Sequence, residues 1–153
     1  MLRMLNPSFM LLVTMSLALV TPQLAQAKEE INTTFFGKLA IEGYDTVAYF
    51  TEQKAVEGSK DYEFAWRDAN WRFSSAANKS LFVADPERYA PSYGGYCAYA
   101  VSQGKTASID PEQWTIVDGR LFLNYNADIQ QRWLGNRDAY IKAADDNWPD
   151  VVN

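Results

Sequence analysis

The strongest constraint on the fold is a run of aromatic side chains that alternates with polar or small ones. In residues 62–66 and again in residues 71–73 every second side chain is aromatic, and Arg67–Asn70 between them suits a short turn. Because successive side chains of a β-strand point to opposite faces, this spacing places the aromatic rings on one face. The pattern predicts a β-hairpin with one buried, aromatic face.

A second hairpin is predicted nearer the C-terminus. Trp114–Val117 and Leu121–Tyr125 are two short strand-like runs, and Asp118-Gly119 joins them. Asp-Gly supplies the positive φ angles that tight primed turns require. Two antiparallel hairpins, a short central helix and an amphipathic C-terminal helix together indicate an α+β fold in one small domain. The chain shows no internal repeat and no linker.

The central helix is predicted between the two hairpins. Ser75 is a suitable N-cap, and the helix should end near Ala84 because a residue before proline, here Asp85, avoids the helical region. Pro86–Tyr89 should add one further turn. Farther along, Cys97–Ser102 has the apolar character of a buried strand.

The C-terminal helix is predicted over about residues 127–145. Asn126 is a suitable N-cap, and Ile129, Trp133 and Tyr140 fall on one face at helical spacing. Gly135 and the asparagine after it lower helix propensity, so a kink is expected there.

Residues 1–27 are predicted to be a secretory signal peptide. Arg3 supplies the positive charge, residues 9–20 form an apolar core, and Ala25–Ala27 offers the small-x-small cleavage site. The alternative is an uncleaved membrane anchor, for which the apolar run is short. Cleavage would place the remaining chain in the periplasm or outside the cell, with a flexible lead-in over 28–38 and a folded domain over 39–150.

The composition removes several classes of site. The chain has no histidine and one cysteine, Cys97, and its four methionines all lie within residues 1–15. Zinc sites built from Cys₄ or Cys₂His₂, blue copper, haem with a His or Met ligand, His-dependent triads and an internal disulfide are therefore excluded. Without Arg3, 13 of the 14 basic residues remain against 19 acidic ones, a net charge near −6 that argues against nucleic acid and anionic membranes.

The stretch Trp71–Tyr89 resembles the YHS-domain family, in which an aromatic-x-Phe-Cys-Ser-x-x-Cys run leads to a Phe and a Pro-x-x-Tyr ending. Gly43–Phe50, Tyr93–Ala100 and the hairpin at Trp114 extend the resemblance to an exported, single-domain branch of that family. It covers about residues 39–150. The resemblance implies the fold and an exported, periplasmic protein.

The resemblance also suggests metal handling, because the short YHS core occurs in copper-transporting ATPases and similar proteins. In the family that role relies on two cysteines, and Ser74 and Asn78 take their places here. A hydroxyl and an amide are poor ligands for a soft metal. Copper is therefore the candidate cofactor that the family suggests, but no tight copper or zinc site is expected at these two positions.

Three interpretations of Cys97 stay open. As a structural residue it fills a small apolar hole, and Gly94-Gly95 lets a neighbouring element approach closely. As a ligand, its thiolate holds copper, iron or a small molecule together with oxygen donors. The candidate donors are Tyr44, Asp45, Tyr96 and Asp110. As a redox thiol it would need a lowered pKa and a resolving cysteine, and the chain has no second cysteine.

The carboxylates complete the set of candidate residues. Asp45 either caps a helix begun by Thr46–Phe50 or lines a pocket, and Cys97 is expected to be buried or half-buried beside the Gly43–Asp45 turn. Asp45, Asp110 and Glu112 are available for hydrolytic chemistry, but no spacing marks them as a pair. The sequence therefore favours a binding module for a metal or small molecule, with a structural or interaction domain and a thiol redox protein as alternatives, over an enzyme.

Overall fold

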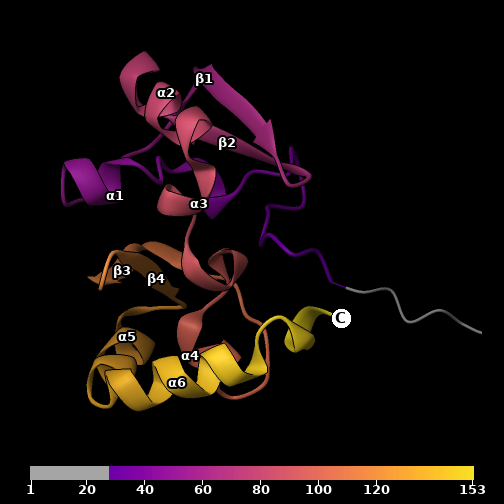
Figure 1. Cartoon of the computed structure of the whole chain (residues 1–153), viewed down its shortest axis with the longest axis vertical. Helices are drawn as coiled ribbons and strands as arrows, with labels where there is room; N and C mark the ends of the chain where they lie inside the picture. The colour runs from indigo at the N-terminus through magenta and orange to yellow at the C-terminus, as the bar shows by residue number, and fades with distance from the viewer. Residues whose placement is uncertain (1–27) are drawn as a thin grey trace, which may run out of the picture.

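The computed structural model of the protein describes residues 28–153 (Figure 1); the predicted signal peptide, residues 1–27, lies outside the described residues. The elements in chain order are η1 (Ile41–Gly43), α1 (Ala48–Thr51), β1 (Ser59–Trp66), β2 (Ala69–Phe73), α2 (Ala76–Ala84), α3 (Pro86–Tyr89), η2 (Ser92–Gly95), α4 (Ala98–Ser102), β3 (Asp110–Val117), β4 (Arg120–Asn124), α5 (Ala127–Leu134), α6 (Arg137–Asn147) and η3 (Asp150–Val152). The predicted α+β class with two antiparallel hairpins is confirmed.

The two hairpins lie toward opposite ends of the molecule, each with its own helices. Figure 1 shows β1 and β2 with α1, α2 and α3 at one end, and β3 and β4 with α4, α5 and α6 at the other. Trp71 and Phe73 of β2 are fully buried against Phe82 of α2, whose ring lies 4.9 Å and 5.1 Å from theirs. Leu121 and Leu123 of β4 belong to the same core, so one apolar cluster joins both hairpins.

A second buried cluster lies beneath the C-terminal helices. Trp133 of α5 is fully buried and its ring lies 5.4 Å from that of Phe122 of β4, and the ring of Tyr93 lies 5.8 Å from that of Phe122. Ala144 of α6 and Val152 complete this cluster. Alternation in β2 and helical spacing in α5 therefore identify core residues, as the sequence predicts, whereas Leu121–Asn124 of β4 are all buried because β4 lies between the two clusters.

The two hairpins and their following helices are built on one plan. β1 and β3 each have eight residues, β2 and β4 each have five, and the two-residue turns occupy 67–68 and 118–119. Both hairpins are irregular at the same place, four residues into the first strand. Ser75 caps α2 and Asn126 caps α5 in the same way: the side-chain oxygen accepts a hydrogen bond from the backbone N–H of the third residue of the helix.

The segments that lead into the two halves are also alike. Ile41, Glu42 and Gly43 have φ angles of 48°, 54° and 90°, and Tyr93, Gly94 and Gly95 have 57°, 60° and 80°. Each left-handed turn is followed by a tyrosine and then by a buried polar residue, Asp45 in the first half and Cys97 in the second. The structure therefore contains a repeated unit where none was found in the sequence, because the backbone plan is kept while nearly every side chain differs.

Two further sequence predictions need correction. The segment Cys97–Ser102 is not a strand: Cys97 forms one isolated bridge to Leu123, and Ala98–Ser102 is the short helix α4. Two alanines give this segment helix propensity, and α4 packs against α6, so tertiary contact decides its form. The C-terminal helix is two helices, α5 and α6, because Asn136 has φ −148° and stops helical geometry after Gly135.

The N-terminal segment of the described chain crosses between the halves. Asn32 donates its backbone N–H to the carbonyl of Gly94 at 2.8 Å and its side-chain amide to Gly95 at 3.1 Å. Ile31 beside it is buried in the main core. None of the helices formed by residues 28–153 has the length and apolar character of a membrane span.

Candidate functional site

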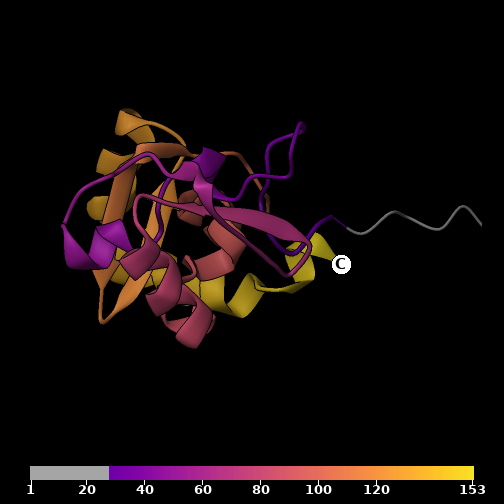
Figure 2. The same cartoon turned by 90° about the horizontal axis from the view of Figure 1, so that it is seen from above.

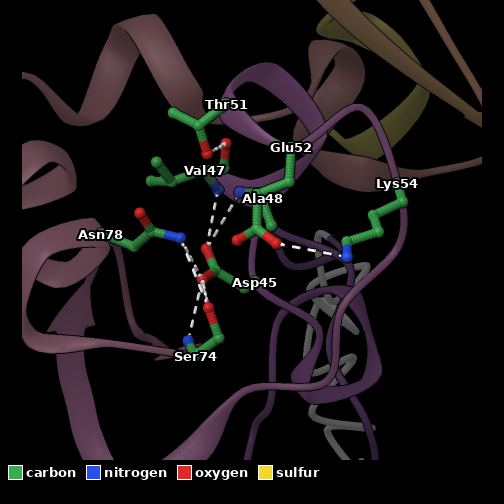
Figure 3. Close-up of polar contacts among 8 residues, drawn as sticks. All are labelled: Asp45, Val47, Ala48, Thr51, Glu52, Lys54, Ser74 and Asn78. Carbon is green, nitrogen blue, oxygen red and sulfur yellow. Dashed lines mark hydrogen bonds and ion pairs between the residues drawn. The ribbon is translucent and has the colours of Figure 1, made fainter.

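Asp45 is the centre of a buried polar cluster. Its Oδ1 accepts hydrogen bonds from the backbone N–H groups of Val47 (2.9 Å) and Ala48 (3.3 Å), which caps the first turn of α1. Its Oδ2 accepts three more, from the backbone N–H (2.8 Å) and hydroxyl (2.7 Å) of Ser74 and from the amide of Asn78 (2.7 Å). Figure 3 shows the two side chains converging on the carboxylate from the start of α2.

This cluster brings together residues that the sequence alone does not place next to one another. Ser74 and Asn78 stand where the YHS resemblance places two cysteines, and both donate to the residue expected to cap α1. A carboxylate has about four lone-pair positions, and Asp45 accepts five hydrogen bonds, so none is left for a metal ion. The cluster fastens α1 to the junction of β2 and α2. The sequence signal for it is a hydroxyl and an amide at the two positions where the resemblance implies cysteines, and both groups are donors that suit a carboxylate.

Cys97 is buried, as predicted, with 1% of its surface exposed. Its Sγ lies 3.5 Å from Oδ1 of Asn124, to which the thiol donates. Burial raises the pKa of the Cys97 thiol, and the nearby backbone N–H groups of Ala100, Tyr125 and Tyr99 offset only part of this rise. A buried thiol with a raised pKa carries little thiolate at neutral pH, which argues against reactive redox chemistry.

Cys97 occupies in the second half of the repeat the place that Asp45 occupies in the first. The carboxylate of Asp45 accepts from the backbone of Val47, Ala48 and Ser74. The groups that face the sulfur belong to Tyr99, Ala100 and Tyr125, which hold the matching positions after the second left-handed turn and after β4. Asp45 and Cys97 therefore lie near backbone N–H groups at matching positions of the two halves, although the N–H of Tyr99 donates to Oδ1 of Asn124.

Asn124 beside the thiol was not identified from the sequence. It is fully buried, accepts from the backbone N–H of Tyr99 at 3.1 Å and donates to Oε1 of Gln130 at 2.6 Å. Gln130 in turn donates to the carbonyl of Trp114 at 3.0 Å and to the hydroxyl of Thr115 at 2.8 Å. These contacts hold α4, α5, β3 and β4 together. The polar groups beside Cys97 are therefore already hydrogen-bonded within the fold.

The remaining candidate residues lie in different places. The hydroxyl of Tyr96 donates to the carbonyl of Glu29 at 2.8 Å, and burial raises its pKa. The pKa of Tyr44 is raised by partial burial and by nearby carboxylates, which include Asp110 and Glu112. Asp110 accepts from the backbone N–H of Glu112 at 3.0 Å in a local turn. Tyr44 and Asp110 are therefore close to each other, whereas Tyr96 is bonded to the N-terminal segment and Asp45 to the start of α1 and to Ser74 and Asn78.

Potential metal ligands are scattered in the described part of the chain. Residues 28–153 contain no group of three or more Cys, Asp and Glu side chains close enough to hold a metal ion. The clefts at their surface lie among charged or polar side chains such as Lys38, Arg67 and Asp138, away from Cys97 and Asp45. The buried polar groups around Asp45 and Cys97 already have hydrogen-bonding partners. Such groups stabilise the fold and are poorly placed to bind a ligand.

The most unusual surface feature is a pair of phenylalanines that the sequence analysis did not single out. Phe35 is 91% exposed and Phe36 is 83% exposed, far above the next large apolar side chain of residues 28–153, Tyr125 at 52%. Their rings meet edge to face at 4.9 Å. Figure 2 shows the indigo segment that follows the grey trace as a loop standing away from the rest of the ribbon.

This loop, residues 33–40, is held at its base by hydrogen bonds on both sides. The backbone N–H of Thr34 donates to Leu39 at 3.0 Å, and Thr33 and Ala40 form a bridge. Asn70 at the start of β2 donates from its side chain to Gly37 at 2.9 Å and from its backbone to Lys38 at 2.8 Å. The two rings are therefore presented at a tip with a fixed base.

Comparison of the chain with protein-family models, with curated proteins and with solved structures found no match. The role of each site therefore follows from its own chemistry.

The surroundings of Cys97 lead to a first prediction. In the native protein the thiol should react with a disulfide reagent on the order of 100-fold or more slowly than in concentrated urea, because access requires the core to open. Raising the pH toward 8.5 should speed the native reaction little, since burial raises the pKa of the thiol. Adding Cu(I), Cu(II) or Fe(II) should leave the rate unchanged.

The matched control is Tyr125→Cys in a Cys97→Ala background, which offers a half-exposed thiol and should react at once. Equally fast labelling of Cys97 would restore the redox interpretation. Protection that appears only with metal would restore the ligand interpretation.

Proposed function

We propose that this protein is an exported interaction domain related to the YHS family, which binds another protein through the loop that carries Phe35 and Phe36. The observation that carries the proposal is the exposure of both rings, 91% and 83%, on a loop whose base is fixed by hydrogen bonds. The predicted signal peptide and the YHS-like motifs support export and family, and the metal-binding alternative lacks a ligand set at Cys97 or at Ser74 and Asn78.

Covering the two rings with a partner would remove their apolar surface from water. Burying one phenylalanine side chain is worth about 1.5–3 kcal/mol, so covering both would contribute roughly 3–6 kcal/mol to binding. Aromatic side chains are enriched among the residues that dominate protein interfaces. Because the base of the loop is already ordered, little further entropy is lost when the rings are covered.

The proposal predicts a position-specific contact. With p-benzoylphenylalanine in place of Phe35 in the full chain, illumination of the cells that make the protein should give one discrete adduct with another protein. An excess of purified wild-type chain, added to permeabilised cells, should suppress the adduct. The double variant Phe35→Ser/Phe36→Ser should compete at least tenfold less well, because it lacks both rings.

The matched control places the same photoreactive residue at Tyr125, which is exposed on the other half of the molecule. The same adducts from both positions, or equal competition by the double variant, would contradict the proposal. A tight Cu(I) site that Cys97→Ala abolishes would favour the metal-binding alternative instead.

A further inference from the structure

The surroundings of the loop narrow the chemistry of its partner. Resting on the proposed function, we propose that the partner is a protein that receives both phenyl rings in an apolar pocket and places a lysine or arginine side chain in an acidic cleft at the base of the loop. The cleft has a volume of about 320 Å³ and lies between the N-terminal segment and the turn of the first hairpin. Its lining residues are Glu29, Glu30, Ile31, Lys38, Arg67 and Asp68.

The cations of this cleft are already neutralised within the molecule. Lys38 lies 3.2 Å from a carboxylate oxygen of Glu29, and Arg67 lies 2.8 Å from one of Glu30. Arg67 also contacts Glu87, and its guanidinium lies 4.6 Å from the centre of the Trp66 ring. Neither cation is therefore free to attract an acidic partner. The same two ion pairs neutralise Glu29 and Glu30, so the uncompensated charge of this cleft is that of Asp68.

Carboxylates outnumber cations around the base of the loop. Asp68 lines this cleft and Glu42 lines the neighbouring one beside Thr33 and Thr34; both are exposed, and neither forms an ion pair with any residue of 28–153. The two clefts together have four carboxylates, Glu29, Glu30, Glu42 and Asp68, against two cations, Lys38 and Arg67. Because Glu29 and Glu30 pair with these cations, the surplus negative charge is that of Glu42 and Asp68. Complementary potential favours a partner surface with a basic rim around its apolar pocket.

A second copy of this chain does not fit the same surface. Two loops meeting tip to tip would bring the same surplus of carboxylates together. Each phenylalanine buries about 150–250 Å², so four rings would cover at most on the order of 1,000 Å², below the roughly 1,200–2,000 Å² of stable interfaces. A basic partner provides both the opposite charge and additional contact area.

A lipid surface is a less suitable partner for this loop than a basic protein, because residues 28–153 are negatively charged. Bacterial and cytoplasmic leaflets with anionic lipids attract basic segments, whereas residues 28–153 carry a net charge near −6 because only Arg3 of the 14 basic residues lies before residue 28. A single apolar anchor gives marginal membrane binding, and stable binding needs a second, usually basic, signal. The carboxylates beside the loop are the opposite of that signal.

The experiment combines the photoreactive residue at Phe35 with a change of charge beside the loop. In Glu42→Lys/Asp68→Asn the adduct yield should fall at least tenfold, because the two carboxylates that form no ion pair within residues 28–153 are removed and a positive charge is added. The control variant Asp128→Asn/Asp138→Lys makes the same change of net charge at exposed residues of α5 and α6 and should stay within twofold of wild type. Raising NaCl from low to high concentration should lower the wild-type yield.

Every other outcome of this experiment overturns one named claim: the basic partner, the protein partner or the proposed function. An adduct that persists in Glu42→Lys/Asp68→Asn overturns the basic partner and leaves the interaction through Phe35 and Phe36 intact. An adduct of twice the mass of the chain, or co-sedimentation of the purified chain with phosphatidylcholine or phosphatidylcholine/phosphatidylglycerol vesicles that Phe35→Ser abolishes, overturns a protein partner of this chemistry. The absence of any adduct from the chain with p-benzoylphenylalanine at position 35 and no charge change overturns the proposed function itself. If Glu42→Lys/Asp68→Asn does not fold, as judged by the loss of its thermal unfolding transition, the single variant Glu42→Gln is tested instead. This variant should lower the adduct yield at least threefold.

Discussion

Replacing Asp45 with alanine is expected to lower the free energy of unfolding by about 3–5 kcal/mol, because removing one partner of a buried charged cluster leaves the others without compensation. Five hydrogen bonds end on this carboxylate, from Val47, Ala48, Ser74 and Asn78. A domain of this size has a total stability of about 5–15 kcal/mol, so the variant should be close to unfolding at physiological temperature. Urea denaturation followed by tryptophan fluorescence measures the change.

Two smaller substitutions test whether the loss belongs to the cluster. Ser74→Ala removes one hydroxyl donor and should reduce stability by about 1 kcal/mol, the usual size of one hydrogen bond. Ser80→Ala removes a hydroxyl that bonds an α2 carbonyl at the exposed surface, so it should change stability by less than ~0.5 kcal/mol. If Asp45→Ala were no worse than Ser74→Ala, the carboxylate would not be the fastening point between α1 and α2.

The sequence predicts most of the fold because its local signals agree with the tertiary structure. Aromatic alternation locates β1 and β2, Asp118-Gly119 locates the second turn, and Ser75 and Asn126 are the caps of α2 and α5. At Cys97–Ser102 the signals conflict, since an apolar run of this length suits either a strand or a buried helix. Contact with α6 favours the helix, and that contact cannot be inferred from the segment itself.

The candidate site was less accessible from the sequence because its residues meet only through the fold. Asp45 and Cys97 were both singled out, and both are buried, but they lie in matching positions of two repeated units with separate hydrogen-bonding partners. The repeat escapes sequence comparison because a left-handed turn and a hairpin register depend on backbone geometry more than on side-chain identity. Phe35 and Phe36 escaped for another reason: two adjacent aromatic residues have no periodicity, and their exposure is a property of the folded loop.

The second large effect concerns Gly94, which was expected to allow a close approach and does so. A Cβ at this position would lie 1.8 Å from the carbonyl oxygen of Glu30 and 2.9 Å from its carbon, and φ is +60°. We expect Gly94→Ala to lower the free energy of unfolding by about 3–4 kcal/mol, of which the left-handed backbone accounts for about 1–2 kcal/mol. The remainder follows because Glu30 must move, which disturbs the burial of Ile31, worth about 1.5–3 kcal/mol.

Gly104 offers the matched control that separates backbone strain from steric contact. Its φ of +70° is close to that of Gly94, but a Cβ there would have no atom within 4 Å, so Gly104→Ala should lose only the strain, about 1–2 kcal/mol. Gly94→Ala should also release the segment from Asn32, whose backbone bonds Gly94, and thereby free the base of the loop that carries Phe35 and Phe36. Chymotrypsin should then cut at these two residues faster than in Gly104→Ala. Equal losses of stability and equal cleavage rates in the two variants would mean that the contact between Glu30 and Gly94 does not hold the loop, because strain alone would then explain both.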